Sequence, residues 1–452
     1  MESSTFFSRA SDFSLFRPVF NMINVFADDA STNPARSTAP STRLTPDRVY
    51  VQELLFLRKG YPLWHPKPAE NMPEAYRKEG VRIGDVGLLN ESGEFYFLFN
   101  ACLPADDPVN SGRVPEGFKP IYGLDDQYTT RHSEEYAVGS FVLSDPAAIQ
   151  RLDHDGDNGV SATIGTPNAT RLSFTSQASQ GAVLILPEGG RKEDHQQLGV
   201  FLQYAVGCAQ SWYKHLEERG LGNSKMTLYL VTGCDKTRAW GVASFTNVHS
   251  DSPVTLDFES GLNFGDRPLT YQFTRSDSAT SASGTDEVFL AQSGCVFLRG
   301  FKIAIRKQWL SRSVTAIHLP NTNVANFKLD QPKMKTMFRR KRQMYHPSDT
   351  LNQWILDNNP KVDVAITHDD DWASVIKQKD RSFPGDEELV HRLSKNLKIL
   401  KLPGQDNLYG SFETGNQLTV EFLEKGPEIH ETVPFHSIRQ SLVTGQENVE
   451  KK

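Results

Sequence analysis

Four consecutive residues, His368-Asp369-Asp370-Asp371, are of types that could hold a metal ion. They follow residues 362–367, where apolar side chains alternate as in a β-strand. Carboxylates beyond the carboxyl end of a strand are a common source of Mg²⁺ ligands in α/β proteins. The sequence therefore predicts a candidate metal site at Asp369, Asp370 and Asp371. Capping of the following helix by Asp369 or Asp370 is the alternative that the sequence favours.

A second acidic cluster, Asp153, Asp155 and Asp157, resembles the start of a calcium-binding loop. The sixth position holds Asn158 in place of glycine, and the twelfth holds Ile164 in place of the bidentate glutamate. These departures favour an acidic surface loop. The signatures of phosphate loops, dinucleotide-binding turns, nucleophile elbows and zinc proteases do not occur, so no cofactor is expected.

Basic residues gather in residues 299–342, which hold twelve basic residues and one acidic residue, a formal charge of +11. The rest of the chain carries −17. A field of this sign attracts a nucleic acid, an acidic protein or an anionic membrane surface, and such a run is also typical of nuclear-import signals. Docking against the acidic remainder of the same chain is the alternative. The partner-binding residues are predicted where the charge is densest, at Arg339, Arg340, Lys341 and Arg342.

Length and composition limit the class of protein. The chain has 452 residues, of which 38% are hydrophobic and 23% charged, and a formal net charge of −6. This content supports two or three domains with buried cores and excludes collagen-like, coiled-coil and disulfide-scaffold proteins. No apolar run approaches the roughly 18 residues of a transmembrane helix. Four isolated cysteines and the lack of a secretory signal predict a cytoplasmic location, or a nuclear one if the basic run acts in import.

The elements that must position these groups form an α+β fold of several parts. A β-rich part at residues 48–170 contains a hairpin made by residues 81–89 and 95–99, and it joins or adjoins an α+β part at residues 171–345. Residues 346–402 are predicted as a small α/β unit. Residues 1–47 are predicted as a disordered tail and linker, and residues 403–452 as a largely flexible tail.

One long amphipathic helix is predicted over residues 193–219, beside a central sheet. Asp194 would complement the dipole at its start, and Gly220 suits its end. Residues 187–190 would then be a strand-to-helix turn, in which the nearby acids repel a phosphate. Further along, residues 276–286 are predicted as a polar loop, and Ser348 as the cap of a C-terminal helix.

Several segments resemble an uncharacterised family of intracellular proteins from mushroom-forming fungi. The segments are GYPLWHPKP, GVRIGDVGLLNESGEFYFLFN, LYLVTGCDKTRAWGVASF and HPSDTLNQWILDNNPKVDVAITHDDDW. The resemblance covers residues 48–400 and implies an intracellular fungal protein near signalling or self-recognition modules, without assigned catalytic residues. Residues 228–232 are also similar to a strand of gasdermin-like pore-forming domains, which would imply membrane activity.

These observations favour a non-enzymatic interaction or regulatory protein with a basic partner-binding segment at residues 299–342. The first alternative is a metal-assisted enzyme that uses the cluster at residues 368–371. The second is a membrane-active, gasdermin-like pore-forming or lipid-binding protein, which would also use an aromatic face at Phe13, Phe16 and Phe20.

Overall fold

The structure is a computed structural model, and it confirms the predicted α+β class. It describes residues 44–90, 93–152, 171–221, 227–246, 253–260, 271–274, 279–285, 291–306, 345–401 and 408–412. The N-terminal aromatic residues, the calcium-loop candidate and the basic run at residues 339–342 lie outside the described residues. None of the helices in the described part of the chain is long and apolar enough to span a membrane.

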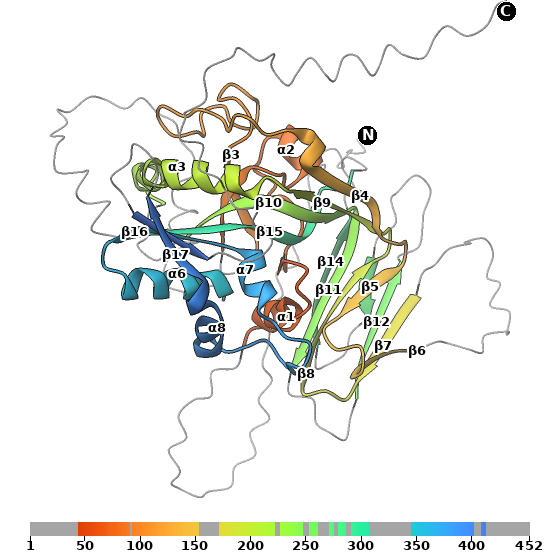
Figure 1. The fold of residues 1–452 in the computed structure, drawn as a ribbon. Helices are drawn as coiled ribbons and strands as arrows, with labels where there is room; N and C mark the ends of the chain where they lie inside the picture. The colour runs from red at the N-terminus through yellow and green to blue at the C-terminus, as the bar shows by residue number, and fades with distance from the viewer. Residues whose placement is uncertain are drawn as a thin grey trace, which may run out of the picture. The chain divides into compact units, whose positions relative to one another are not determined.

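The largest sheet in the described part has ten strands, and its main path runs β17-β18-β16-β15-β10-β2-β3 (Figure 1). Its strands are β1 (Tyr61–Pro62), β2 (Asp85–Leu89), β3 (Phe95–Asn100), β4 (Thr129–Tyr136), β9 (Gly190–His195), β10 (Leu228–Thr237), β15 (Gly294–Ile305), β16 (Val362–His368), β17 (Leu397–Lys401) and β18 (Leu408–Phe412). β2 and β3 confirm the predicted hairpin, which turns at Gly93 with φ of 72°. One sheet thus joins strands from the three parts predicted over residues 48–402, and β18 comes from the predicted C-terminal tail.

Two four-stranded sheets share a second core. Their orders are β14-β11-β8-β5 and β13-β12-β7-β6. The strands are β5 (Ser140–Leu143), β6 (Ile149–Leu152), β7 (Arg171–Ser176), β8 (Gln180–Leu186), β11 (Ala239–Thr246), β12 (Val254–Ser260), β13 (Tyr271–Thr274) and β14 (Ala279–Thr285). Buried Phe174 and Phe258 from one sheet pack with Val183 and Phe245 from the other, as in a β-sandwich. The predicted loop at residues 276–286 was wrong, because β14 pairs along β11 through its backbone, which needs no apolar side chains.

The helices in the described part of the chain are α1 (Pro46–Leu55), α2 (Glu74–Glu79), α3 (Leu198–Glu218), α6 (Pro347–Asn358), α7 (Asp369–Ser374) and α8 (Asp386–Leu393), with 3-10 turns η1 (Asp126–Tyr128) and η2 (Ser394–Asn396). α3 buries an apolar face that includes Phe201, Ala205, Trp212 and Leu216, as its sequence pattern predicts. It contacts β10, β15 and β16. The N-cap of α6 is His346, not the predicted Ser348, because the His346 Nδ1 accepts from the Ser348 N–H at 3.1 Å.

The predicted start of the long helix at residue 193 was wrong. Residues 190–195 form β9, which pairs with β10 and β4, and α3 begins only at Leu198. Residues 187–189 therefore connect strand β8 to strand β9 and not a strand to a helix, with Gly189 at φ of 71°. The polar sequence of β9 has no strand-like alternation, and it is held in the sheet by backbone pairing on both sides. As a consequence, no acidic residue lies in the first turn of α3.

The middle of β15 packs closely against β10, and side chains of β10 reach across it. The pairing of β10 with β15 shifts between Val231 and Gly233, so Thr232 has no register partner. On β15 itself, a Cβ at Gly300 would overlap the Leu230 carbonyl oxygen and lie 2.7 Å from the Tyr229 ring. Glycine at position 300 therefore allows β10 side chains to reach the start of α7.

Candidate functional site

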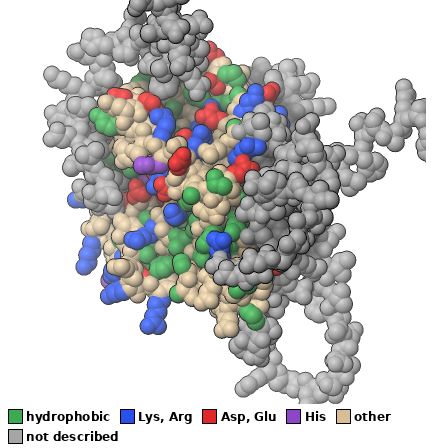
Figure 2. All heavy atoms as spheres, turned by 90° about the vertical axis from the view of Figure 1, so that its right-hand side faces the viewer, with side chains coloured by type: hydrophobic (Ala, Val, Ile, Leu, Met, Phe, Trp, Pro, Cys, Tyr) green, Lys and Arg blue, Asp and Glu red, His purple; other side chains and the backbone are tan. Residues whose placement is uncertain are grey.

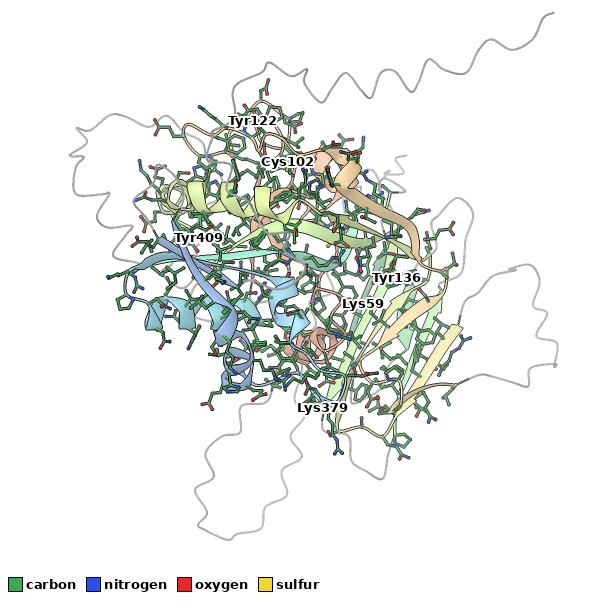
Figure 3. The ribbon with its side chains drawn as sticks, viewed as in Figure 1. Lys59, Cys102, Tyr122, Tyr136, Lys379 and Tyr409 are labelled. Carbon is green, nitrogen blue, oxygen red and sulfur yellow. The ribbon has the colours of Figure 1, made fainter. Side chains whose placement is uncertain are left out.

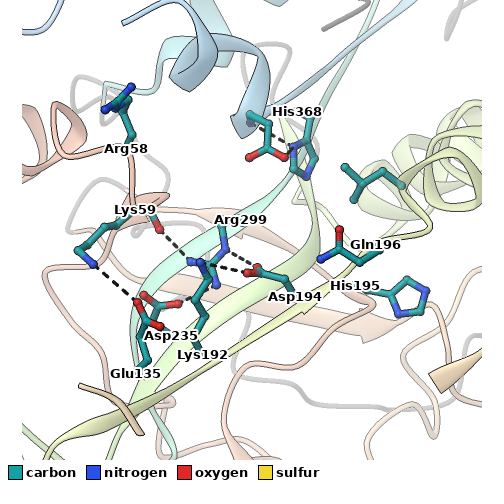
Figure 4. A pocket seen from close by; sticks show the side chains of 12 residues that line it. Arg58, Lys59, Glu135, Lys192, Asp194, His195, Gln196, Asp235, Arg299 and His368 are labelled. Carbon is teal, nitrogen blue, oxygen red and sulfur yellow. Dashed lines mark hydrogen bonds and ion pairs between the residues drawn. The ribbon is translucent and has the colours of Figure 1, made fainter. Parts of the chain in front are cut away.

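A charged pocket of about 230 Å³ lies where the large sheet meets the loop after α1 and the starts of α3 and α7 (Figure 4). The lining residues are Arg58, Lys59, Glu135, Lys192, Asp194, His195, Gln196, Leu198, Asp235, Arg299, His368 and Asp370. Four are lysine or arginine and four are aspartate or glutamate. This lining suits a polar ligand, because an apolar one would not replace the water around these charges.

Arg299, on β15, forms the floor of the pocket. Its guanidinium donates to Asp194, to Asp235 at 2.7 Å and to the Lys59 carbonyl at 2.8 Å. The Tyr136 hydroxyl donates to the second oxygen of Asp235 at 2.6 Å. Burial lowers the pKa of Arg299, but the two carboxylates outweigh burial and raise it overall, so its charge is permanent. Both inner carboxylates are therefore neutralised within the floor.

The mouth of the pocket carries cations. Arg58 is exposed and has φ of 57°, and it is the one non-glycine residue in the left-handed region among the residues that the structure describes. Its guanidinium lies 3.5 Å from the Ile376 carbonyl, and no carboxylate in the described ranges pairs with it. Lys59 is 3.9 Å from Glu135, and its ammonium also lies 5.0 Å from the centre of the Tyr136 ring (Figure 3). The partly exposed carboxylates of Glu135 and Asp370 also line the pocket. Every other cation of the lining pairs with a carboxylate, so Arg58 is the one unpaired cation among the described lining residues.

The start of α3 contributes the positive end of a helix dipole to the same pocket. Leu198, the first residue of α3, lines the pocket together with Gln196. The N-cap residue Gln197 does not cap the helix, because its Oε1 accepts from the Asp125 N–H at 3.0 Å and lies 3.1 Å from His195 Nε2. With neither a side-chain cap nor an acid in the first turn, the helix end favours an anion.

The predicted metal residues take three separate roles. Asp371 accepts from the His368 N–H at 2.7 Å, and His368 Nδ1 lies 3.1 Å from the Asp370 N–H, so His368 and Asp371 form the capping box of α7. Neither Asp369 nor Asp370 is the cap. Asp370 lines the pocket and lies 3.3 Å from His368 Nδ1. Among the described residues, no group of three or more histidine, cysteine, aspartate or glutamate side chains is arranged to hold a metal ion.

Asp369 is buried behind the pocket and accepts hydrogen bonds at both of its oxygens. The donors are the Tyr229 hydroxyl, the Gly300 N–H at 3.1 Å and the Trp372 indole N–H at 3.0 Å. Burial raises the pKa of Asp369 to about 6. Beside the pocket, burial lowers the pKa of His368, but the carboxylates of Asp370, Asp369 and Asp371 together outweigh burial and the net shift is upward. Thr232 Oγ1, at the bulge of β10, lies 2.8 Å from His368 Nε2 and holds the ring in place.

Three of the twelve basic residues predicted as a partner-binding segment are engaged inside the protein. Arg299 forms the pocket floor, and Lys302 is 2% exposed with its ammonium 3.1 Å from Asp349. Arg306 donates to the carbonyls of Val362 and Asn359 at 2.9 and 3.0 Å. On the face in Figure 2, the described basic and acidic side chains are interspersed. The other nine basic residues, including residues 339–342, lie outside the described residues.

Sequence reasoning identified Asp370 and Arg299 as candidates but did not place them in one pocket. It missed Arg58, Lys59 and Lys192, which carry no motif. A comparison with known protein families and a comparison with curated proteins both find no match. The function is therefore inferred from the chemistry of the pocket itself.

Proposed function

We propose that this protein is a non-enzymatic regulatory protein whose charged pocket binds a small ligand with an anionic group. The observation that carries the proposal is the division of charge in the pocket. The inner carboxylates Asp194 and Asp235 are neutralised by Arg299, whereas Arg58 at the mouth has no carboxylate partner among the described residues. A phosphate, sulfate or carboxylate group supplies that partner.

Backbone strain and size support the same proposal. A positive φ at an arginine is costly, and such strain gathers at functional sites because the surrounding structure must hold it. The volume of about 230 Å³ is below the roughly 300–1,000 Å³ of sites for drug-sized molecules, so the ligand is small. Burial lowers the pKa of His195, so its ring adds no charge to this wall near neutral pH, and its two nitrogens already lie 2.9 Å from Thr129 Oγ1 and 3.1 Å from Gln197 Oε1.

The test is calorimetry of the full chain with inorganic phosphate, sulfate and citrate as probes. We expect saturable binding of at least one probe. Arg58→Gln should weaken it by about 10- to 100-fold, because a hydrogen bond to a charged group contributes about 1.5–3 kcal/mol. Arg381→Gln, at an exposed arginine outside the pocket, should leave it unchanged. Equal binding by the native chain and by Arg58→Gln, or no binding of any probe, would refute the proposal.

A second proposed function is partner binding through residues 339–342. Residues 307–344 carry nine basic residues and one acidic residue, a formal charge of +8, after Arg299, Lys302 and Arg306 are set aside. A salt titration with duplex DNA tests it. We expect log affinity to fall linearly with log salt, with a shallower slope when the four basic residues at 339–342 become alanine. Identical slopes, or no binding at low salt, would remove nucleic acid as the partner.

A further inference from the structure

Helices α6 and α8 contact each other at one end of the large sheet (Figure 1). A groove of about 710 Å³ runs between them. Half-buried Trp354 of α6 and Val390 of α8 form its apolar floor. The exposed carboxylates of Asp357, Asp386 and Glu387 stand on its rim. We refer to this surface as the acidic groove.

The acidic groove has a strong excess of negative charge. No lysine or arginine is among the residues that line it. A fourth carboxylate, that of Asp349, is paired with buried Lys302 beneath the groove. No cation in the described ranges pairs with Asp357, Asp386 or Glu387. An apolar floor with an acidic rim suits a peptide that carries basic residues next to an apolar one.

The sequence of this chain contains such a peptide, a few residues before Tyr345. The hydroxyl of Tyr345 donates to Asp386 at 2.9 Å, so residue 345 is held at the rim of the groove. Arg342 precedes it by three residues, which span at most about 11 Å. Met337 and Phe338 come directly before the four basic residues at 339–342. A tether this short gives a high effective concentration, which favours contact within one chain.

We infer that the acidic groove binds the chain's own basic run, residues 337–342. The four basic side chains pair with the acidic rim, and Met337 and Phe338 cover Trp354 and Val390. The inference rests on the second proposed function in one respect, since the same residues would bind an acidic partner. The contact within the chain and the partner then compete, so the groove regulates access to the basic run.

A labelled peptide of residues 333–344 tests the inference by fluorescence anisotropy on full-length chains. In the emptied variant, the four basic residues at 339–342 are alanine, so the groove has no occupant. We expect this variant to bind the peptide at least tenfold more tightly than the native chain does. Adding Asp357→Asn, Asp386→Asn and Glu387→Gln to the emptied variant should weaken binding at least tenfold.

A matched control keeps the change of net charge but leaves the groove intact. It adds Glu116→Gln, Glu217→Gln and Glu218→Gln, at exposed residues outside the groove, to the emptied variant. This control should bind the peptide as tightly as the emptied variant does. Equal binding by the emptied variant and its groove-substituted form would overturn the inference, as would an equal loss in the control.

Duplex DNA gives a second measurement that separates the two proposals. At one salt concentration, the otherwise native chain with the three groove substitutions should bind duplex at least threefold more tightly than the native chain. Equal binding of duplex by these two chains would refute the proposed competition between the acidic groove and a partner for the basic run. If neither chain binds duplex while the emptied variant still binds the peptide through its groove, nucleic-acid binding fails and the acidic groove stands.

Discussion

Arg299→Met removes the cation from the floor of the pocket but keeps a long, unbranched side chain there. Arg299 is 8% exposed and pairs with Asp194 and Asp235, so the substitution leaves two carboxylates without their main partner. Removing one partner of a buried ion pair costs about 3–5 kcal/mol. Lys192 remains 3.4 Å from Asp194 and compensates in part. We therefore expect the free energy of unfolding to fall by about 3 kcal/mol, near the lower end of this range.

The assay is urea unfolding of the full chain, followed by circular dichroism. Arg131→Met is the matched control, because Arg131 pairs with Asp126 at 2.6 Å but its side chain is 52% exposed, and such pairs contribute about 1 kcal/mol or less. Adding Asp194→Asn and Asp235→Asn to Arg299→Met should restore part of the loss, because the uncompensated charges disappear. A loss under about 1 kcal/mol, or no restoration in the triple variant, would show that these ion pairs do not hold the floor.

Three further predictions concern the sheet, the buried carboxyl group and α3. Gly300→Ala should destabilise the protein by about 1–3 kcal/mol, since its Cβ meets the backbone of Leu230, and an unchanged melting temperature would contradict this. Because the folded-state pKa of Asp369 is raised from 3.8 to about 6, its contribution to stability falls as pH rises through that window. Between pH 4 and pH 7, the free energy of unfolding of the native chain should therefore fall by up to about 3 kcal/mol relative to that of Asp369→Asn. A difference between the two chains that stays constant with pH in urea unfolding would refute the burial argument. Trp212→Ala should lower the free energy of unfolding by about 3–5 kcal/mol in the same assay, because Trp212 is buried. Lys214→Ala, on the exposed face of α3, should lower it by under about 1 kcal/mol. Similar losses in the two variants would contradict the orientation of α3.

Local patterns made several elements predictable. Alternating apolar residues and a glycine turn predicted the β2–β3 hairpin, and apolar spacing predicted the buried face of α3. Gly220 ends that helix with φ of 68°, as expected for a helix C-terminus. Predictions failed where pairing in the sheet overrides the local pattern. β9 and β14 have polar sequences that resemble a helix start and a loop, yet both are strands because neighbouring strands bond to their backbones.

The sequence by itself determined the α+β class, the position of the long helix within a few residues and the charge asymmetry of residues 299–342. The tertiary structure alone decided which of those charges are internal. Arg299 meets Asp194 and Asp235 across separations of 105 and 64 residues. Those contacts exist because β9, β10 and β15 are neighbours in one sheet, and strand order is set by long-range packing. A count of charges cannot show whether an arginine faces a partner or a buried carboxylate.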